Sequence, residues 1–179
     1  IDILHAHGSD VRYSMKTKKW GWMVRSNLIK AKKVLVSTPD IISIVQAVRD
    51  DVQYLPNPID TDRFKPVEQF YPKFSCLYIR HKYEVFPADL AQILSKKKIP
   101  IFTISPGLYS YFDMHKIYQK FGIFIDRFTI SSFSKSCLES MACGLATIDY
   151  RHKDRFNERV EYLQKNGSIL NEGKANRNY

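Results

Sequence analysis

The chain contains few glycines, few cysteines and no long apolar run. Its 179 residues include seven glycines and three cysteines. Neither G-x-x-x-x-G-K-[ST] nor G-x-G-x-x-G occurs, so a P-loop and a dinucleotide-binding fingerprint both lack support. No apolar stretch approaches the roughly 20 residues that a membrane-spanning helix needs.

The three cysteines, Cys76, Cys137 and Cys143, have no C-x-x-C spacing and are odd in number. This usage predicts free thiols in a reducing cytosol. No signal peptide is visible, but the chain begins at Ile1 with residues typical of a buried strand. We therefore expect residues, and any targeting signal, to be missing upstream. The expected location is cytoplasmic, with peripheral contact at the inner membrane face.

Positive charge is the strongest compositional bias. The chain carries 28 basic and 18 acidic side chains, a formal net charge of +10. This excess suits a nucleic acid, an anionic membrane surface or a polyphosphate substrate. The basic residues form small clusters rather than one tail, which is equally typical of solvated helix ends and turns.

Short apolar runs alternate with helical periods, which indicates βαβ units, parallel sheets and an α/β fold. Strands are expected at 2–7, 34–37 and 52–55, with helices at 20–30 and 40–48. Later strands are expected at 75–80, 100–105, 123–128 and 146–150. The helices between and after them are expected at 87–97, 111–120, 134–143 and 155–165.

Prolines divide these two series. Pro56-Asn57-Pro58 ends the first, because a residue before proline favours extended backbone. We expect residues 1–58 to be the C-terminal part of a first domain, 59–66 a linker and 67–179 a second domain. The first part has too few helices to cover both faces of a parallel sheet, so its domain is expected to be incomplete.

Polar residues follow the first predicted strand, and open α/β sheets bind ligands outside the carboxyl ends of their strands. His5 and His7 face the same side of that strand. Gly8 would let a ligand approach the backbone closely. The alternative is a satisfied histidine pair with Asp10 capping the next turn. A metal site here would lack a third imidazole, so no metal is predicted.

Cations follow strands in the second domain. Arg80 and Lys82 come after its first strand, and such cations can neutralise a diphosphate as it becomes a leaving group. Arg127 follows a later strand, where it could face phosphate or pair with Asp126. A basic, solvated turn is the alternative for the first pair.

The stretch SKSCLESMACGLATI, residues 134–148, predicts a helix that carries Glu139, ends at Gly144 and feeds a buried strand. N–H groups at the helix start can hold phosphate oxygens. The carboxylate of Glu139 can accept two hydrogen bonds from a sugar diol. Alternatively, Ser136 and Glu139 fit the S-x-x-E capping box.

The same stretch resembles the paired-glutamate signature of GT-B-fold retaining glycosyltransferases, the glycosyltransferase family 4-like group (group 1). HAHGSDVR at 5–12, AKKVLVSTPDI at 31–41 and YLPNPIDTDRF at 54–64 resemble the family's first domain and its link to the second. The chain is similar to a divergent or truncated member. It departs from the pattern at Ser131, where the first glutamate of the pair would stand, and it lacks the glycines beside Arg80 and Lys82.

The resemblance implies two Rossmann-like domains that transfer a hexose with retention, without cofactor or metal. The donor would be a UDP- or GDP-linked sugar and the acceptor a sugar, lipid or protein. His7 would contact the sugar, Arg80 and Lys82 the diphosphate, and Glu139 the ribose. The further substrate-binding residues implied are Gly8, Asp10, Arg127, Ser131, Ser132, Phe133, Ser134 and Lys135.

Two other functions stay open. Ser131 and the missing glycines favour a non-catalytic GT-B-like subunit that binds or scaffolds a partner. The charge alone would suit a basic nucleic-acid-binding protein, but no recognised nucleic-acid module is present, and no nucleic-acid partner is predicted. Asp60-Thr61-Asp62 lies in the proline-bounded linker, so we interpret this D-x-D as a turn rather than a metal–nucleotide motif.

Overall fold

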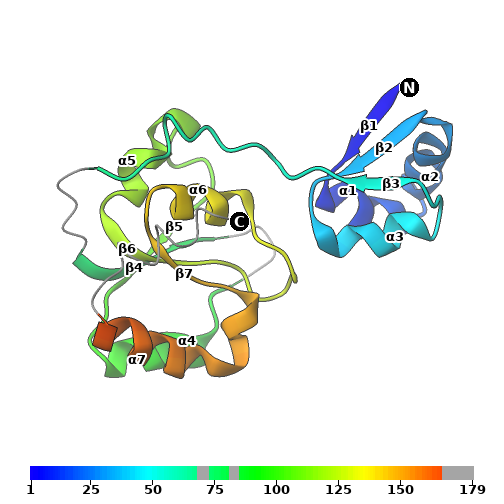
Figure 1. Ribbon diagram of the computed structural model, residues 1–179. Helices are drawn as coiled ribbons and strands as arrows, with labels where there is room; N and C mark the ends of the chain where they lie inside the picture. The colour runs from blue at the N-terminus through cyan, green and yellow to red at the C-terminus, as the bar shows by residue number, and fades with distance from the viewer. Residues whose placement is uncertain (68–72, 81–84, 167–179) are drawn as a thin grey trace. The chain divides into compact units, whose positions relative to one another are not determined.

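The computed structural model describes residues 1–67, 73–80 and 85–166 (Figure 1). The chain divides into two compact units, Ile1–Pro58 and Ile59–Tyr179. Each unit contains a sheet in which every pair of neighbouring strands is parallel. The predicted α/β class with parallel sheets is therefore confirmed.

The first unit has a three-stranded sheet of order β1-β2-β3. Its elements are β1 (Ile3–Ala6), α1 (Gly8–Arg12), η1 (Ser14–Lys16), α2 (Gly21–Lys30), β2 (Lys33–Val36), η2 (Pro39–Ile41), α3 (Ile42–Gln46) and β3 (Val52–Tyr54). Val34 and Val36 of β2 are fully buried and pack with Leu28 of α2 and Val45 of α3. Ile3 of β1 is 61% exposed, because its side chain points to the face opposite this core.

The second unit has a four-stranded sheet of order β5-β4-β6-β7. Its elements are β4 (Lys73–Ile79), α4 (Ala88–Lys96), β5 (Ile101–Ile104), η3 (Tyr111–Asp113), α5 (Met114–Tyr118), β6 (Phe121–Ile125), α6 (Lys135–Ala142), β7 (Ala146–Ile148), η4 (Tyr150–Arg155) and α7 (Phe156–Asn166).

Helices cover both faces of the second sheet, as Figure 1 shows. One face packs against α4 and α7 through a core that includes Tyr78, Ile123 and Ile125. The other packs against α5 and α6 through a core that includes Leu77 and Phe124. Alternate residues of β4 and β6 thus enter opposite cores, and near-continuous apolar runs such as FGIFI result.

The predicted linker packs against the second unit. Phe64 is 1% exposed and Ile59 packs beside it, both in the core under α5 and α6. Gln119 Nε2 donates to the carbonyl of Lys65 at 3.0 Å. Part of the predicted linker at 59–66 thus contributes apolar side chains to the core of the second unit.

All three cysteines are free and buried. Burial raises the pKa of Cys76 to about 12. Within the described ranges, no helix is long and apolar enough to cross a membrane.

Candidate functional site

Four strand ends form the carboxyl edge of the second sheet. The ladder continues just beyond the strands: the N–H of Arg80 donates to the carbonyl of Ile104, and the N–H of Asp126 to that of Ile148, both at 2.8 Å. These bonds fix the positions of the residues that directly follow β4 and β6. The edge is therefore a defined platform for the predicted phosphate-binding residues.

Arg80 and Arg127 occupy neighbouring positions on this platform. Tyr78 of β4 pairs with Ile125 of β6, and each arginine lies two residues further along its strand direction. Arg80 is exposed and Arg127 half-buried. Among the residues that the structure describes, neither forms an ion pair, and the buried Nε of Arg127 has no hydrogen-bond partner. Lys82, the other predicted phosphate ligand, lies outside the described residues.

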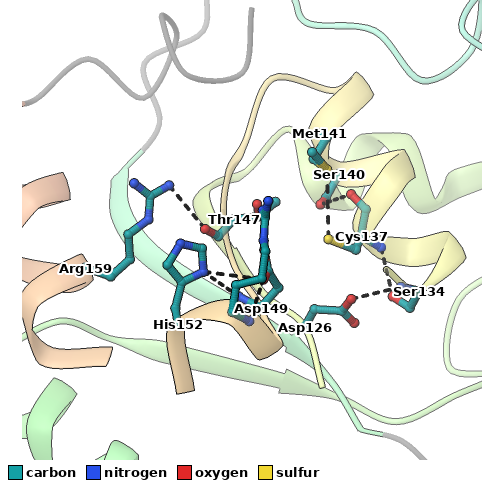
Figure 2. A network of polar contacts seen from close by, with 10 residues as sticks. Asp126, Ser134, Cys137, Ser140, Met141, Thr147, Asp149, His152 and Arg159 are labelled. Atoms are coloured by element: carbon teal, nitrogen blue, oxygen red, sulfur yellow. Dashed lines mark hydrogen bonds and ion pairs between the residues drawn. The ribbon is translucent and has the colours of Figure 1, made fainter. Parts of the chain in front are cut away.

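At the start of α6, a backbone N–H donates a hydrogen bond to the carboxylate of Asp126 (Figure 2). Ser134 is the N-cap; its Oγ accepts from the N–H of Cys137 at 3.0 Å. The N–H of Ser134 itself donates to Oδ2 of Asp126 at 2.9 Å. Asp126 is 1% exposed. A carboxylate is stabilised at a helix N-terminus for the same reason that a phosphate would be.

This arrangement corrects one expectation for the loop before α6. The N–H of Ser134 was predicted to hold a phosphate oxygen, but Asp126 already accepts from it. Ser132 is buried, Phe133 half-buried and Ser131 exposed. A diphosphate above this loop would therefore depend on side chains such as Lys135, which is 47% exposed, more than on the helix N–H groups.

Glu139 lies on the inner face of α6. Its Oε2 accepts from the hydroxyl of Tyr118 at 3.1 Å, and its Oε1 is 3.8 Å from Nζ of Lys135. The side chain is 4% exposed. Burial raises the pKa of Glu139, and the contacts with Tyr118 and Lys135 offset part of that rise.

The capping-box interpretation of Glu139 is wrong. The N-cap is Ser134 rather than Ser136, which moves the third helical position to Cys137. A thiol cannot reach back to the cap as a glutamate would, and Glu139 bonds Tyr118 instead. Ribose binding by Glu139 remains a prediction, and it requires a ligand atom to reach a side chain that is almost fully covered.

An aromatic and basic cluster adjoins Glu139. Nζ of Lys135 lies 4.6 Å from the ring centre of Tyr111. The guanidinium of Arg63 lies 4.7 Å from the ring centre of Phe112, which is 65% exposed. Cations over aromatic faces of this kind are attracted by the ring quadrupole. The sequence analysis missed this cluster, because its members come from three separate segments.

The end of β7 carries a second buried carboxylate, also missed from sequence. Asp149 is fully buried and accepts from Nε and an Nη of Arg151, both at 2.9 Å. Burial by itself would raise the pKa of Asp149, but contacts with His152 and Arg151 outweigh burial and lower it. Arg151 also lies over the ring of Phe133, at 4.8 Å. Arg151, the first residue of the basic cluster at 151–153, is therefore already paired with Asp149.

Cys137 of α6 is fully buried, and both carboxylates act on its thiol. Burial raises the pKa of its thiol, and the charges of Asp126 and Asp149 raise it further. A thiol in this environment stays protonated and unreactive. Cys137 is therefore a packing residue of α6, in contact with Met141.

In the first unit, His7 and Asp10 are exposed at the carboxyl end of β1. His7 is the N-cap of α1, and its ring lies 4.8 Å from that of His5. Nε2 of His5 is 3.0 Å from the carbonyl of Leu55. The satisfied-histidine alternative thus holds for His5, and His7 is left open to solvent. The N-cap residues of α1 and η1, His7 and Tyr13, form no side-chain capping hydrogen bond.

The structure gives a reason for glycine at position 8 that differs from the predicted one. A Cβ at Gly8 would lie 1.7 Å from the guanidinium of Arg12. That guanidinium makes two bonds of 2.6 Å to Asp40 and one of 3.0 Å to Thr38. The space that a Cβ at Gly8 would occupy is therefore filled by Arg12, and ligand approach at Gly8 stays a prediction.

The turn interpretation of Asp60-Thr61-Asp62 agrees with the structure. Oδ1 of Asp60 accepts from the N–H of Arg63 at 3.2 Å, and its carbonyl accepts from Phe64 at 2.8 Å. Across the described part of the chain, no group of three or more His, Cys, Asp or Glu residues could hold a metal ion.

The predicted site residues thus fall into two sets. His7, Gly8 and Asp10 lie in the first unit, and the residues from Arg80 to Glu139 lie in the second.

No protein-family model matches this chain. The chain also matches no curated protein.

Proposed function

We propose that this chain belongs to a GT-B-like glycosyltransferase that moves a hexose from a UDP- or GDP-linked sugar to an acceptor. Retention of configuration and independence from metal follow from the sequence resemblance. One observation carries the proposal: Arg80 and Arg127 stand at adjacent strand ends on the carboxyl edge of a parallel sheet. In this position two guanidiniums would neutralise the charge that develops on a departing diphosphate.

The other residues take roles that fit their positions. Lys135 would supply a further cation at the start of α6, and His7, which is exposed in the first unit, would contact the sugar. Glu139 would bind the ribose. Arg127 replaces Lys82 as the second phosphate ligand in this proposal, since it follows a strand that pairs directly with β4.

Two features favour the rival function, a non-catalytic subunit of the same fold. Ser131 cannot supply negative charge near a developing oxocarbenium ion. Asp126 places a carboxylate at the start of α6, where it would repel a phosphate. The rival predicts nucleotide binding without turnover, or no nucleotide binding at all.

Calorimetric titration with UDP, GDP and their nucleosides tests the proposal. Arg80→Gln and Arg127→Gln should each weaken diphosphate binding about tenfold or more, the scale of one lost charged hydrogen bond. Nucleoside binding should change little. Arg155→Gln, at an exposed arginine of η4 outside the set of predicted site residues, makes the same charge change and should bind like the parent chain.

Turnover is measured separately, by release of UDP or GDP from the sugar donor. Equal losses for nucleoside and nucleotide, or equal losses in the Arg155→Gln control, would remove the arginines from a phosphate site. Diphosphate binding without donor turnover in the natural full-length protein would favour the non-catalytic rival.

A further inference from the structure

The first unit contains a pocket that includes one predicted substrate-binding residue, Asp10, and an apolar wall that the predicted roles do not explain. It lies between β1, the α1–η1 turn and α2, and its volume is about 410 Å³. This volume is within the range of sites for small ligands, about 300–1,000 Å³. Every lining residue belongs to the first unit, so the pocket exists independently of the second.

The covered part of the pocket is apolar. Val11 and Leu28 are fully buried and Ala6 is 5% exposed, while Leu4 and Val24 are half-buried beside them. No ionisable side chain is among these five residues. A surface of this kind favours hydrocarbon and disfavours a polyol, whose hydroxyls would lose their water without gaining partners.

The pocket also has apolar bulk at its open part and four polar lining residues, His5, Asp10, Ser14 and Asn27. Trp20 is 45% exposed and Met23 37% exposed. Within the ranges that the structure describes, no hydrogen bond is formed by the carboxylate of Asp10 or the side-chain amide of Asn27. A hydroxyl can donate to the first and accept from the second.

We propose that this pocket binds an amphiphilic alcohol, with the hydrocarbon chain against Val11 and Leu28 and the hydroxyl at Asp10. A fatty acid has the same chain but carries a negative charge that Asp10 repels. A free sugar satisfies the polar end but not the apolar part. The charge and the covered apolar wall together select the alcohol.

If the proposed function holds, on which this step alone rests, the alcohol is the acceptor. Its oxygen forms a bond to the anomeric carbon of the donor sugar, and the bond from that carbon to the diphosphate oxygen breaks. The hydroxyl proton leaves with the diphosphate. The acceptor class would then be a lipid alcohol rather than a sugar or a protein.

Trp20 lines the pocket, so its fluorescence can report binding. The chain has two tryptophans, Trp20 and Trp22. Trp22 is 69% exposed and does not line the pocket, so Trp22→Phe leaves Trp20 as the single emitter. The probes are 1-octanol, sodium octanoate and methyl glucoside, each titrated into the Trp22→Phe chain. We expect a saturable blue shift with octanol, at least tenfold weaker binding of octanoate, and no shift with methyl glucoside.

Two matched variants of α2 locate the binding, each made in the Trp22→Phe chain. Val24→Phe narrows the pocket and should abolish the octanol response. Ile29→Phe makes the same kind of enlargement at a position that is 64% exposed and away from the pocket, and should leave the response unchanged. Asp10→Asn should bring octanoate binding close to that of octanol. Circular dichroism checks that each variant keeps its helices.

A response to methyl glucoside in place of octanol overturns the proposal, as does octanol binding that survives Val24→Phe. Octanoate binding as tight as octanol binding in the parent also overturns it. The readout needs no sugar donor, so its outcome is separate from that of the proposed function. Octanol binding without donor turnover would keep the pocket assignment and remove the acceptor role.

Discussion

Asp126 shows how one buried carboxylate can decide the chemistry of a helix start. Its Oδ2 accepts from the N–H of Ser134 inside the second unit. The sequence indicated that Asp126 follows a strand, but not that it would turn toward α6. Ser134 and Ser136 are both good cap residues; the structure uses Ser134, which also contacts Asp126 through its N–H.

Removing this carboxylate should therefore destabilise the second unit. Asp126→Ala leaves the Ser134 N–H without its acceptor, and we expect the free energy of unfolding to fall by about 1–3 kcal/mol. Urea denaturation measures the change. Asp154→Ala, at an exposed aspartate of η4, should stay within about 0.5 kcal/mol of the parent. Equal effects of the two substitutions would mean that the Asp126 bond contributes nothing.

Glu139 predicts a pH dependence of stability. Burial raises its pKa above the ordinary value of 4.5, so the folded chain holds this proton more tightly than the unfolded chain. Its contribution is thus most favourable below the unfolded pKa and decreases as the pH rises through the folded pKa. Glu139→Gln should remove this decrease, giving a flatter free energy of unfolding as the pH rises above 4.5.

Denaturant titrations at several pH values test this expectation. Glu158→Gln is the matched control, because Glu158 is an exposed residue of α7. The control should keep the slope of the parent chain. A parent-like slope in Glu139→Gln would show that the glutamate does not hold a proton more tightly in the folded state.

At the scale of elements, periodicity and turn residues predicted every strand and the approximate place of every α-helix longer than five residues. The expected helix at 40–48 is divided into η2 and α3, and that at 111–120 into η3 and α5. In the second case Ser110 holds a tight first turn by accepting from the N–H of Phe112. The strand expected to reach residue 150 ends at Ile148, because Asp149 caps η4. Such ends depend on single hydrogen bonds that apolar patterns do not encode.

The C-terminus of α6 gives a physical meaning to the SMACGL letters. The N–H of Gly144 donates to the carbonyl of Met141, and that of Leu145 to the carbonyl of Ser140, at 2.9 and 3.1 Å. Gly144 has φ = +92°. These are the two bonds of a Schellman motif, which favours glycine at this position. Part of the resemblance to the glycosyltransferase signature therefore reflects how a helix ends.

Gly144→Ala should destabilise the chain by about 1–2 kcal/mol, the cost of a left-handed alanine, plus the displacement of Pro66. A Cβ at this position would lie 3.3 Å from Cγ of Pro66. Gly107→Ala is the matched control, with φ = +81° and nothing within 4 Å. Thermal unfolding should rank Gly144→Ala as the less stable. The reverse order would show that the contact with Pro66 costs nothing.

At the scale of the whole molecule, the sequence predicted two parallel-sheet parts but not how the residues between them are used. Prolines indicated a boundary, and the contacts divide the chain after Pro58. The apolar side chains of Ile59 and Phe64 could not be assigned from their polar surroundings in sequence. The two cation positions at Arg80 and Arg127 could be assigned to strand ends, but their adjacency required the strand order β4-β6.

Phe64→Ala should lower the stability of the second unit by about 3–5 kcal/mol, the usual cost of deleting a buried phenylalanine. Both tryptophans lie in the first unit, so tryptophan emission follows that unit while far-ultraviolet circular dichroism follows both. The dichroism transition should move to lower urea and the emission midpoint should not. Phe102→Ala, at a 52% exposed site of β5, should shift dichroism far less. Coincident shifts of both signals would show that the units unfold as one.

The buried thiols allow transient opening of the second unit to be measured by chemical labelling. Cys76, Cys137 and Cys143 all lie there, and burial raises the pKa of each, so a disulfide reagent finds no thiolate on the native surface. A thiol can therefore react only after the second unit opens, so the rate of labelling reports how often the unit opens. Emission from Trp20 and Trp22 records the other unit. Mass spectrometry of labelled and unlabelled chains would therefore resolve openings too rare to shift any equilibrium signal.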